Sequence, residues 1–591
     1  MVAGHLAVMF AEAVEQFGEE PAVRIRDDQD WRQLTYDELG ERVRTLAARL
    51  IDRGLQAGDR VAIFSLNRPE WTLVDLACAS AGLVSVPLYP SSTAEQVRYI
   101  LSDAGCRLAF LDGERELAIV EQVRSDLPDL EAVFTFADVP DAETLASELA
   151  AAPSDESAVD ARIASATADD LATLVYTSGT TGEPKGVMLS HRGFTHQVEA
   201  LNRFFSVGPG DVSLCFLPLS HAFERAWTYM VLANGCLNTY VPDPRTVAEQ
   251  LILAQPSLLV TVPRLLEKVF NTAKEKVADS PLKQRIMAWA LKTGSAYHRE
   301  LVAGRTPSRL LTVKLKAADG LVLKAVRDAI GGPKKVLACG GAPLRKEIEE
   351  FFFGCGVLVL QGYGLTEASP LVTFPPPRDY LFGTVGKVMP GGELALGDGG
   401  EVLYRGPNLM LGYWNRPEET AATIVDGWLH TGDVGRLDAG YLRITDRIKD
   451  LIVTSNGKNV APAPIEGLLA SDPLFEYSLL LGDNRPYLTL LVAPSLPHLD
   501  EIGKQLQLSW ARREELLAHP EVLAEIWRRL TALTEKLPRH EQIRDIRLLP
   551  DGFTQENGLL TPTLKVKRKE VEARFAQLVD EMYAKVGKPR E

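Results

Sequence analysis

Eleven consecutive residues combine hydroxyl side chains, glycines and a lysine in an order suited to binding phosphate. They are Tyr176, Thr177, Ser178, Gly179, Thr180, Thr181, Gly182, Glu183, Pro184, Lys185 and Gly186. Glycines let the backbone turn tightly and bring its N–H groups against a ligand, while the hydroxyls donate hydrogen bonds and the lysine supplies a point charge. The segment therefore predicts a cradle for a polyphosphate. The alternative is a linker rich in Ser, Thr and Gly that binds nothing.

This predicted phosphate cradle is not a Walker A loop. A Walker A loop has a glycine immediately before its lysine and a hydroxyl residue after it, whereas Lys185 follows Pro184 and precedes Gly186. Pro184 also disfavours the helical conformation at Glu183, so no helix is expected to run through the loop. The segment is a phosphate-binding candidate of another type.

Two later loops carry residues suited to a planar ring and to a metal ion beside phosphate. The first contains Cys339, Gly340, Gly341, Ala342, Pro343 and Leu344, and the second contains Gln361, Gly362, Tyr363, Gly364, Leu365, Thr366 and Glu367. Paired glycines let a ring lie flat on the backbone, and a carboxylate near phosphates makes chemical sense chiefly as a Mg²⁺ ligand. The second loop is not a dinucleotide fingerprint, because the third glycine is missing and Glu367 would lie near the pyrophosphate. A tight turn would explain the glycines but not Glu367.

The segments around these loops alternate between strand and helix patterns. Strands are predicted at residues 60–66, 84–88, 107–111, 132–136, 171–175, 212–219, 258–262, 335–339 and 356–360, and helices at 41–51, 71–81, 94–104, 114–125 and 191–205, with a helix-rich block at 264–330. Strands separated by helices of about ten or more residues pair in parallel through crossovers, which predicts an α/β layered fold. Residues 151–170 are expected to form a surface excursion.

Composition argues against several classes of protein. The 591 residues are 46% hydrophobic and 24% charged, as in ordinary globular proteins. A net charge of −15 makes a nucleic-acid partner a poor expectation. The six cysteines form no C-x-x-C pair, which indicates buried, reduced thiols rather than a disulfide or zinc framework. With no signal-peptide pattern and no apolar run of about eighteen residues, we expect a cytoplasmic protein whose membrane contact, if any, is peripheral.

Taken in order, the motifs resemble those of the adenylate-forming superfamily, over nearly the whole chain. That superfamily includes acyl-CoA synthetases, firefly-type luciferases and peptide-synthetase adenylation domains. The resemblance rests on the phosphate cradle, the two later loops, and the motifs W-L-H-T-G-D at 428–433 and D-R-I-K-D at 446–450. Three further motifs are similar to the long-chain fatty acyl-CoA synthetase branch: H-A-F-E-R at 221–225, S-N-G-K-N-V-A-P at 455–462 and L-T-P-T-L-K at 560–565.

The resemblance implies ATP- and Mg²⁺-dependent activation of a medium- or long-chain fatty acid, with coenzyme A as co-substrate. The first step would form acyl-adenylate and pyrophosphate, and the second acyl-CoA and AMP. Mg²⁺ near Thr177 and Glu367 would neutralise phosphate charge. Lys565 matches the lysine that bridges the acyl carboxylate and the α-phosphate, although the usual Ser-Gly before it is absent and Lys567 and Arg568 lie close by.

Further site residues are implied by the same resemblance. Asp433 would bind the ribose hydroxyls with Arg447 nearby, and Tyr363 would stack on the adenine. The predicted catalytic residues are Lys565, Thr177, Glu367 and His221, although a histidine at a strand end is often only structural. The predicted cofactor-binding residues are Thr177, Ser178, Gly179, Thr180, Thr181, Gly182, Lys185, Gly340, Gly341, Ala342, Gln361, Gly362, Tyr363, Gly364, Thr366, Asp433, Arg447, Lys449 and Lys458. The predicted metal ligands are Thr177 and Glu367.

The resemblance also implies a division into domains. Residues 1–445 would form a large AMP-binding domain of α/β lobes with a small β-barrel-like unit, and 446–450 a hinge. Residues 451–591 would form a smaller, mobile α+β domain carrying Lys565. The segment 498–537 has a helical pattern like the extra insertion of long-chain synthetases. Phe204, Phe205, Phe223 and Trp227 are candidates either for the wall of an acyl tunnel or for plain core.

Two other functions remain open on the sequence. One is a fatty acyl-AMP ligase that passes its adenylate to a carrier protein, although residues 367–386 are short for the insertion such ligases generally carry. The other is a degenerate homologue that binds nucleotide or lipid without catalysis. Retention of Lys185, Glu367, Asp433, Arg447 and Lys565 argues against that alternative.

Overall fold

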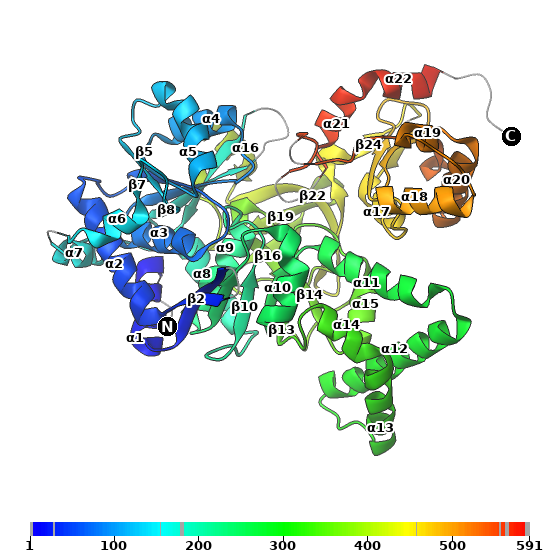
Figure 1. Ribbon diagram of the computed structural model, residues 1–591, viewed down its shortest axis with the longest axis horizontal. Coiled ribbons are helices and arrows are strands. Elements are labelled where there is room, and N and C mark those ends of the chain that lie inside the picture. Colours follow the sequence, from blue (N-terminus) through cyan, green and yellow to red (C-terminus); the bar gives the residue numbers. More distant parts are fainter. Residues whose placement is uncertain are drawn as a thin grey trace.

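The computed structural model describes residues 4–27, 30–153, 155–177, 183–456, 458–554, 557–561 and 566–584 (Figure 1). The first large sheet of the fold has eight strands. Their order is β20 (Gly412–Tyr413), β9 (Lys185–Ser190), β8 (Leu171–Thr177), β4 (Val84–Leu88), β3 (Arg60–Phe64), β5 (Cys106–Leu111), β6 (Ala132–Thr135) and β7 (Glu143–Thr144). The strands from β8 to β7 pair in parallel, as predicted. β9 instead runs antiparallel to β8, because a connection of a few residues can close a hairpin but not a crossover.

The second large sheet has seven strands and carries the other loops of interest. Their order is β14 (Val359–Gln361), β13 (Val336–Cys339), β12 (Leu258–Thr261), β10 (Val212–Cys215), β11 (Leu237–Tyr240), β1 (Pro21–Asp27) and β2 (Asp30–Thr35). All neighbours pair in parallel except β1 and β2, which form a hairpin. The carboxyl ends of β13 and β14 therefore lie side by side at one edge.

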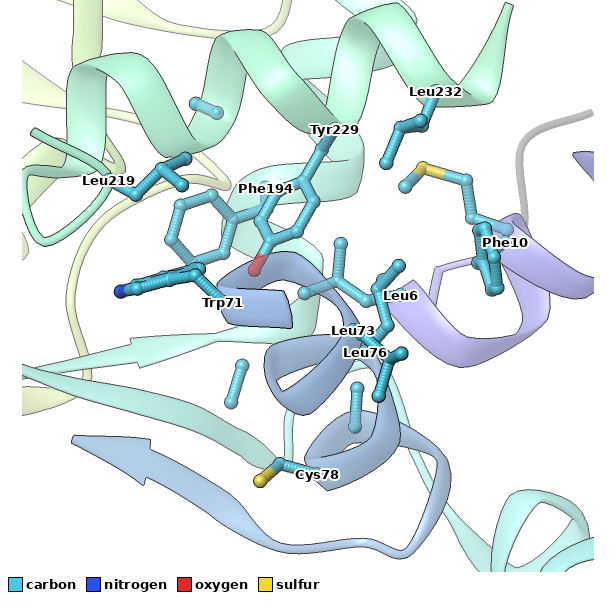
Figure 2. Close-up of a cluster of buried hydrophobic side chains, with 14 of the residues drawn as sticks. Leu6, Phe10, Trp71, Leu73, Leu76, Cys78, Phe194, Leu219, Tyr229 and Leu232 are labelled. Carbon is cyan, nitrogen blue, oxygen red and sulfur yellow. The ribbon is translucent and has the colours of Figure 1, made fainter. Parts of the chain in front are cut away.

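Four helices fill the space between the two large sheets: α1 (Leu6–Phe17), α3 (Pro69–Ser80), α8 (His191–Asn202) and α9 (Ala222–Ala233). Figure 2 shows Leu6, Trp71, Phe194 and Tyr229 from these helices meeting in one buried cluster. Eleven of the twelve residues of α3 are buried, as expected for a helix enclosed on all sides. Phe205 and Trp227 also belong to this core, and Phe204 and Phe223 pack against it.

The outer faces of both sheets are covered by helices. α4 (Ala94–Ala104) and α5 (Glu114–Gln122) cover the first sheet, whereas α2 (Tyr36–Asp52) contacts α1 and α3 and contributes to the core cluster between the sheets. α10 (Val247–Ala254), α11 (Pro263–Ala278) and α15 (Lys346–Gly354) cover the second. The helix-rich block predicted at 264–330 begins with α11 and continues through α12 (Pro281–Val302), α13 (Arg309–Ala318) and α14 (Lys324–Ala329), with α13 at the outer edge (Figure 1). The excursion at 151–170 contains an unpredicted helix, α7 (Ser157–Ser165).

Smaller sheets complete the large domain. One contains β18 (Glu393–Leu396), β19 (Glu401–Arg405), β22 (Trp428–Asp438), β21 (Ile424–Val425) and β23 (Tyr441–Arg447), and another contains β15 (Tyr363–Gly364), β16 (Leu371–Phe374) and β17 (Lys387–Val388). The long antiparallel pair of β22 and β23 leads directly into residues 448–450. These small sheets correspond to the β-barrel-like unit that the family resemblance implied within the large domain.

The C-terminal part has its own hydrophobic clusters, whose buried members all lie between Ile452 and Tyr583. It contains β24 (Ile452–Val453), β25 (Asn459–Val460), α17 (Pro462–Leu469), β26 (Tyr477–Leu481), β27 (Leu488–Ala493), α18 (Leu496–Gln505), α19 (Arg513–Leu517), α20 (Pro520–Thr534), β28 (Ile543–Leu548), α21 (Arg568–Arg574) and α22 (Ala576–Ala584). Helices α18 to α20 confirm the helical pattern predicted at 498–537. The fold class is therefore a large α/β domain followed by a smaller α+β domain, as predicted.

Two expectations from composition can also be compared with the structure. All six cysteines are buried and none forms a disulfide. Over the described part of the chain, no helix combines the length and the apolar character needed to cross a bilayer.

Candidate active site

The phosphate cradle lies in the hairpin that joins β8 to β9. Thr177 ends β8 and is paired with Lys185, the first residue of β9. The predicted cradle residues Ser178, Gly179, Thr180, Thr181 and Gly182 lie outside the described residues. The pairing nevertheless brings a hydroxyl and an ammonium group to the same end of the hairpin.

The ammonium group of Lys185 already has two partners. It forms an ion pair with Glu419 and lies 5.2 Å from the centre of the Tyr413 ring. β20 pairs antiparallel with β9 and places Tyr413 opposite Val187, which explains how a segment over 200 residues away reaches the cradle. Sequence analysis missed Tyr413 and Glu419, because neither belongs to a motif that identifies a phosphate site.

Glu367 is connected to the same hairpin. It lies in the short 3₁₀ turn Thr366–Ala368, which contacts β9. The Tyr413 hydroxyl donates a hydrogen bond to Glu367 Oε1 at 2.9 Å. Burial and the Glu367 carboxylate raise the pKa of Tyr413, so this hydroxyl keeps its proton and remains a donor. Tyr413 thus joins Lys185 to Glu367, the residues expected to face phosphate and metal.

The donor set at Thr177 and Glu367 suits Mg²⁺. A hydroxyl and a carboxylate are hard oxygen ligands, and Mg²⁺ usually takes one or two carboxylates and completes its shell with water and substrate phosphates. Among the described residues, no group of three or more His, Cys, Asp or Glu side chains could hold a metal by itself. The residues present therefore fit a metal that binds together with a nucleotide.

The two glycine-containing loops follow neighbouring strands. Cys339 ends β13 and pairs with Gln361 at the end of β14, so the loops that begin at Gly340 and Gly362 lie at the same edge of the second sheet. Ligands of open α/β sheets bind beyond the carboxyl ends of the strands. The two loops are therefore neighbours at an edge where such sheets bind ligands, and the site for a planar base stays a prediction.

Close packing explains three glycines of these loops. A Cβ on Gly364 would lie 1.9 Å from the carbonyl oxygen of Pro370, and one on Gly362 would lie 2.7 Å from the Phe374 ring. A Cβ on Gly340 would lie 2.9 Å from the ring of Phe223. Gly341 has a φ of +79°, a backbone conformation that favours glycine, although a Cβ there would meet only Val262 Cγ1, at an ordinary contact distance of 3.7 Å.

Asp433 is the centre of a hydrogen-bonded group. The Tyr363 hydroxyl donates to Asp433 Oδ2 at 2.6 Å, and Arg447 Nε donates to Oδ1 at 2.8 Å. The register of β22 and β23 places Asp433 directly opposite Arg447. The Asp433 side chain is only 5% exposed, while that of Arg447 is 56% exposed, so the arginine can also contact a ligand. Burial and the Asp433 carboxylate raise the pKa of Tyr363 well above its ordinary value.

His221 and its neighbours have structural partners. His221 is the N-cap of α9, and its Nδ1 accepts the backbone N–H of Phe223 at 3.1 Å. Glu224 is fully buried and accepts the Leu217 N–H at 3.1 Å, and burial raises its pKa well above the usual range. Arg225 is buried and ion-paired with Asp75. The cap explains His221 by itself, and a catalytic role for it stays a prediction.

The remaining predicted residues lie in several places. Gln361 and Thr366 are buried, Ala342 is exposed, Lys449 lies in the 3₁₀ turn Ile448–Asp450, and the side chain of Lys458 is exposed. Lys565 lies outside the described residues. On either side of the segment that contains it, Leu560 and Val566 pair in an isolated antiparallel bridge. A cavity of about 690 Å³ between α11, α12 and α15 is lined by none of the predicted site residues.

Comparison with known proteins gives consistent results along the chain. Residues 10–414 match the family described as AMP-binding enzyme, and residues 449–587 match the family described as AMP-binding enzyme C-terminal domain. The long-chain-fatty-acid–CoA ligase FadD15 of Mycobacterium bovis is 37% identical over 561 residues, which cover 94% of this chain and 93% of that protein. The peroxisomal long chain acyl-CoA synthetase 7 of Arabidopsis thaliana is 30% identical over 635 residues, covering 99% and 87%.

A solved structure shows the same fold. The A domain of carboxylic acid reductase from Segniliparus rugosus, in complex with AMP and a co-purified carboxylic acid, superposes with a TM-score of 0.75. It covers 99% of this chain and 94% of its own, at 22% sequence identity. At this identity the likeness concerns the fold alone.

Proposed function

The chain belongs to the AMP-binding enzyme family, in its fatty acyl-CoA synthetase branch, and on this basis we propose that it activates long-chain fatty acids through the residues that meet around β8, β9 and β14. The protein is an AMP-forming acid–thiol ligase that uses ATP to activate a fatty acid and transfers the acyl group to CoA. The observation that carries this conclusion is the 37% identity to a long-chain-fatty-acid–CoA ligase over 94% of the chain.

The nucleoside of ATP is held by the group around Asp433. Each carboxylate oxygen has two lone pairs, so Asp433 can accept ribose hydroxyls while it also accepts from Tyr363 and Arg447. Those two partners fix the orientation of the carboxylate before ATP arrives. The base lies over the neighbouring loops at Gly341 and Tyr363, where the Tyr363 ring offers a stacking surface.

The phosphates are held at the end of the β8–β9 hairpin. Lys185 binds phosphate oxygens after exchanging its ion pair with Glu419 for the nucleotide. Thr177 and Glu367 would hold Mg²⁺, which would supply positive charge beside the phosphates. Tyr413 donates to Glu367 Oε1 and thereby orients the other carboxylate oxygen.

The smaller domain supplies the remaining charge. We assign residues 1–445 to the AMP-binding domain, 446–450 to a hinge and 451–591 to the C-terminal domain. Lys565 bridges the acyl carboxylate and the α-phosphate during adenylation. His221 and Lys458 are assigned to the site on family resemblance, and Lys449 to the hinge.

Measurement of both half-reactions tests this function. Purified protein with ATP, Mg²⁺ and a long-chain fatty acid is expected to release pyrophosphate, and addition of CoA is expected to give acyl-CoA. Pyrophosphate release without any acyl-CoA would favour the fatty acyl-AMP ligase. Absence of both products from folded protein that binds ATP would favour a non-catalytic homologue.

The metal assignment has its own test. Glu367→Gln removes the charge of one proposed metal ligand and keeps its size, so adenylation is expected to need at least about tenfold more Mg²⁺. Tyr413→Phe is the matched control, because it removes only the hydrogen bond to Glu367 and is expected to change the Mg²⁺ requirement much less. An unchanged metal requirement in folded Glu367→Gln would remove Glu367 from the metal site.

A further inference from the structure

The helical block around α13 exposes large apolar side chains to an unusual degree. Leu310, Val313 and Leu321 have exposed fractions of 66%, 65% and 64%, among the highest for large apolar residues in the described chain. They lie on α13 and on the π-helical turn Asp319–Leu323 that continues it into α14. Figure 1 shows α13 at the outer edge of the molecule, away from β8 and β22.

The exposed residues form one face of this continuous helix. Positions 310, 313, 317 and 321 are separated by three, four and four residues, which places them on the same side of a helix. Lys314 and Lys324 are exposed beside them. We call this surface the α13 face; it is formed by Leu310, Val313, Lys314, Ala317, Leu321 and Lys324. It interleaves apolar and basic side chains; the acidic residue that follows at helical spacing, Asp328, is ion-paired with Lys324.

The neighbouring helix α12 repeats this pattern. Leu282, Arg285, Trp289 and Lys292 follow one another at helical spacing, and all four are exposed. Leu282 is 67% exposed and Trp289 is 38% exposed. Apolar and aromatic residues flanked by Lys and Arg are typical of helices that lie in the interface of a bilayer.

The charge of the helical block is opposite to that of the whole chain. Residues 281–329 contain ten Lys and Arg residues and three Asp and Glu residues, a net charge of +7, whereas the chain carries −15. The three acidic residues are already in ion pairs: Glu300 with Arg305, Asp319 with Arg327, and Asp328 with Lys324. Within the described chain, no carboxylate lies within 4.0 Å of the nitrogen atoms of Arg309, Lys314 or Lys316. The block therefore presents uncompensated positive charge.

We propose that the α13 face docks onto the surface of an anionic lipid bilayer. Leu310, Val313 and Leu321 enter the boundary between headgroups and acyl chains. Lys314 on this face and Lys316, which is exposed at its side three residues after Val313, contact lipid phosphates. The remainder of the chain is acidic and is repelled by the same surface, which orients the molecule with α13 towards the lipid. The contact is peripheral and requires no spanning helix.

A second copy of this chain is the other occupant to consider. A symmetric dimer through this face would bring the Lys314 and Lys316 side chains of two copies together. Like charges at such an interface disfavour association, whereas an anionic bilayer neutralises them. The charge pattern thus favours lipid over self-association. The proposal does not depend on the catalytic roles assigned above, because none of those residues lies in residues 281–329.

Vesicle co-sedimentation tests the proposal with the full chain. The protein is expected to bind vesicles of phosphatidylcholine with about 30% phosphatidylglycerol more strongly than pure phosphatidylcholine, and high salt is expected to weaken that binding. Each basic residue near an anionic surface contributes about fivefold, so Lys314→Gln with Lys316→Gln should weaken binding about 25-fold. Lys504→Gln with Lys536→Gln makes the same charge change on exposed residues of the C-terminal domain and should leave binding unchanged.

A second set of variants separates apolar insertion from charge. Leu310→Ser with Val313→Ser is expected to reduce vesicle binding at least about tenfold, whereas Ile252→Ser, at a residue 59% exposed on α10, should have no effect. Unchanged thermal unfolding shows that each variant is folded. Equal binding by the α13-face and control variants, or no preference of the parent protein for phosphatidylglycerol, would refute the proposal. So would a dimer, seen by light scattering, that the α13-face variants dissociate while vesicle binding stays unchanged.

Discussion

At the scale of single residues, the ion pair between Lys185 and Glu419 could not be predicted from the sequence motifs, because Glu419 belongs to none of them. Both side chains are partly exposed, at 27% and 38%. Such pairs are worth at most about 1 kcal/mol, so a nucleotide phosphate can displace Glu419 at low cost. Glu419 thus holds Lys185 at the end of the hairpin, and in the proposed site it would compete with ATP for this lysine.

Glu419→Gln is accordingly expected to strengthen ATP binding by up to about fivefold, because the competing charge is removed. Isothermal titration with ATP measures the change. Glu418→Gln is the matched control, since Glu418 is the exposed neighbour in the same helix, α16 (Pro417–Thr423). Weaker ATP binding by Glu419→Gln would contradict this role and would indicate that Glu419 binds the nucleotide or its metal.

Lys565 is the residue whose proposed role is specific to one half-reaction. Its charge is needed when pyrophosphate leaves but not when a thiol attacks a finished adenylate. Lys565→Ala is therefore expected to slow adenylation by about 100-fold or more, the usual effect of removing a preorganised charge from a transition state. Supplying synthetic acyl-adenylate with CoA should restore near-normal thioester formation, and an equal defect in both assays would show that the role is wrongly assigned. Lys567→Ala is the control for a nearby basic residue.

At the scale of elements, two short antiparallel pairings form the site. β9 folds back on β8 and so places Lys185 opposite Thr177, and β20 then adds Tyr413 to the edge of β9. β15 packs so closely on the chain before β16 that Gly364 has no room for a side chain. The active-site loops are thus positioned by backbone contacts as well as by the large parallel sheets.

Gly364→Ala should consequently destabilise the large domain by about 2 kcal/mol or more, because the new methyl group would overlap the carbonyl oxygen of Pro370. Urea unfolding of the purified variant measures the loss. Gly320→Ala provides the comparison, because a Cβ on Gly320 meets no heavy atom within 4 Å and should not lower stability. Similar stabilities for the two variants would mean that the turn at Gly364 can relax without cost.

At the scale of the whole molecule, the proposed mechanism needs two arrangements of the two domains. In that mechanism, adenylation requires Lys565 near the phosphates, whereas thioester formation requires room for CoA. Lys449 lies in the turn Ile448–Asp450 at the end of β23, where the large domain gives way to the C-terminal part. A few backbone dihedrals at the end of an element can absorb such a rotation.

Lys449→Pro is expected to separate the half-reactions. Proline fixes φ near −65° and also restricts the residue before it, so the hinge is held in one arrangement. If the adenylating arrangement is the permitted one, pyrophosphate release is kept while acyl-CoA formation falls at least about tenfold. Lys449→Ala serves as the control because it removes the charge but leaves the backbone free. Equal activity of Lys449→Pro in both half-reactions would make Lys449 an ordinary linker residue.

The sequence by itself was sufficient for most elements and for the identity of the site motifs. Alternating hydrophobic segments predicted the parallel strands, since helix and strand periods are local properties of the chain. The hydroxyls, glycines and lysine of residues 176–186 predicted a phosphate site from residue chemistry, whereas the ribose site at 428–433 was implied by resemblance to a known family. The boundaries of β4 and α4 agree with the prediction to the residue.

Only the tertiary structure decided which distant residues share the site. Tyr413 and Glu419 reach Lys185 through the pairing of β20 with β9, and Asp433 faces Arg447 through the register of β22 and β23. The tertiary structure also shows that His221 caps α9 and that the apolar residues of the α13 face are exposed to solvent. Strand pairing and register depend on the packing of the whole chain, and local patterns contain no information about it.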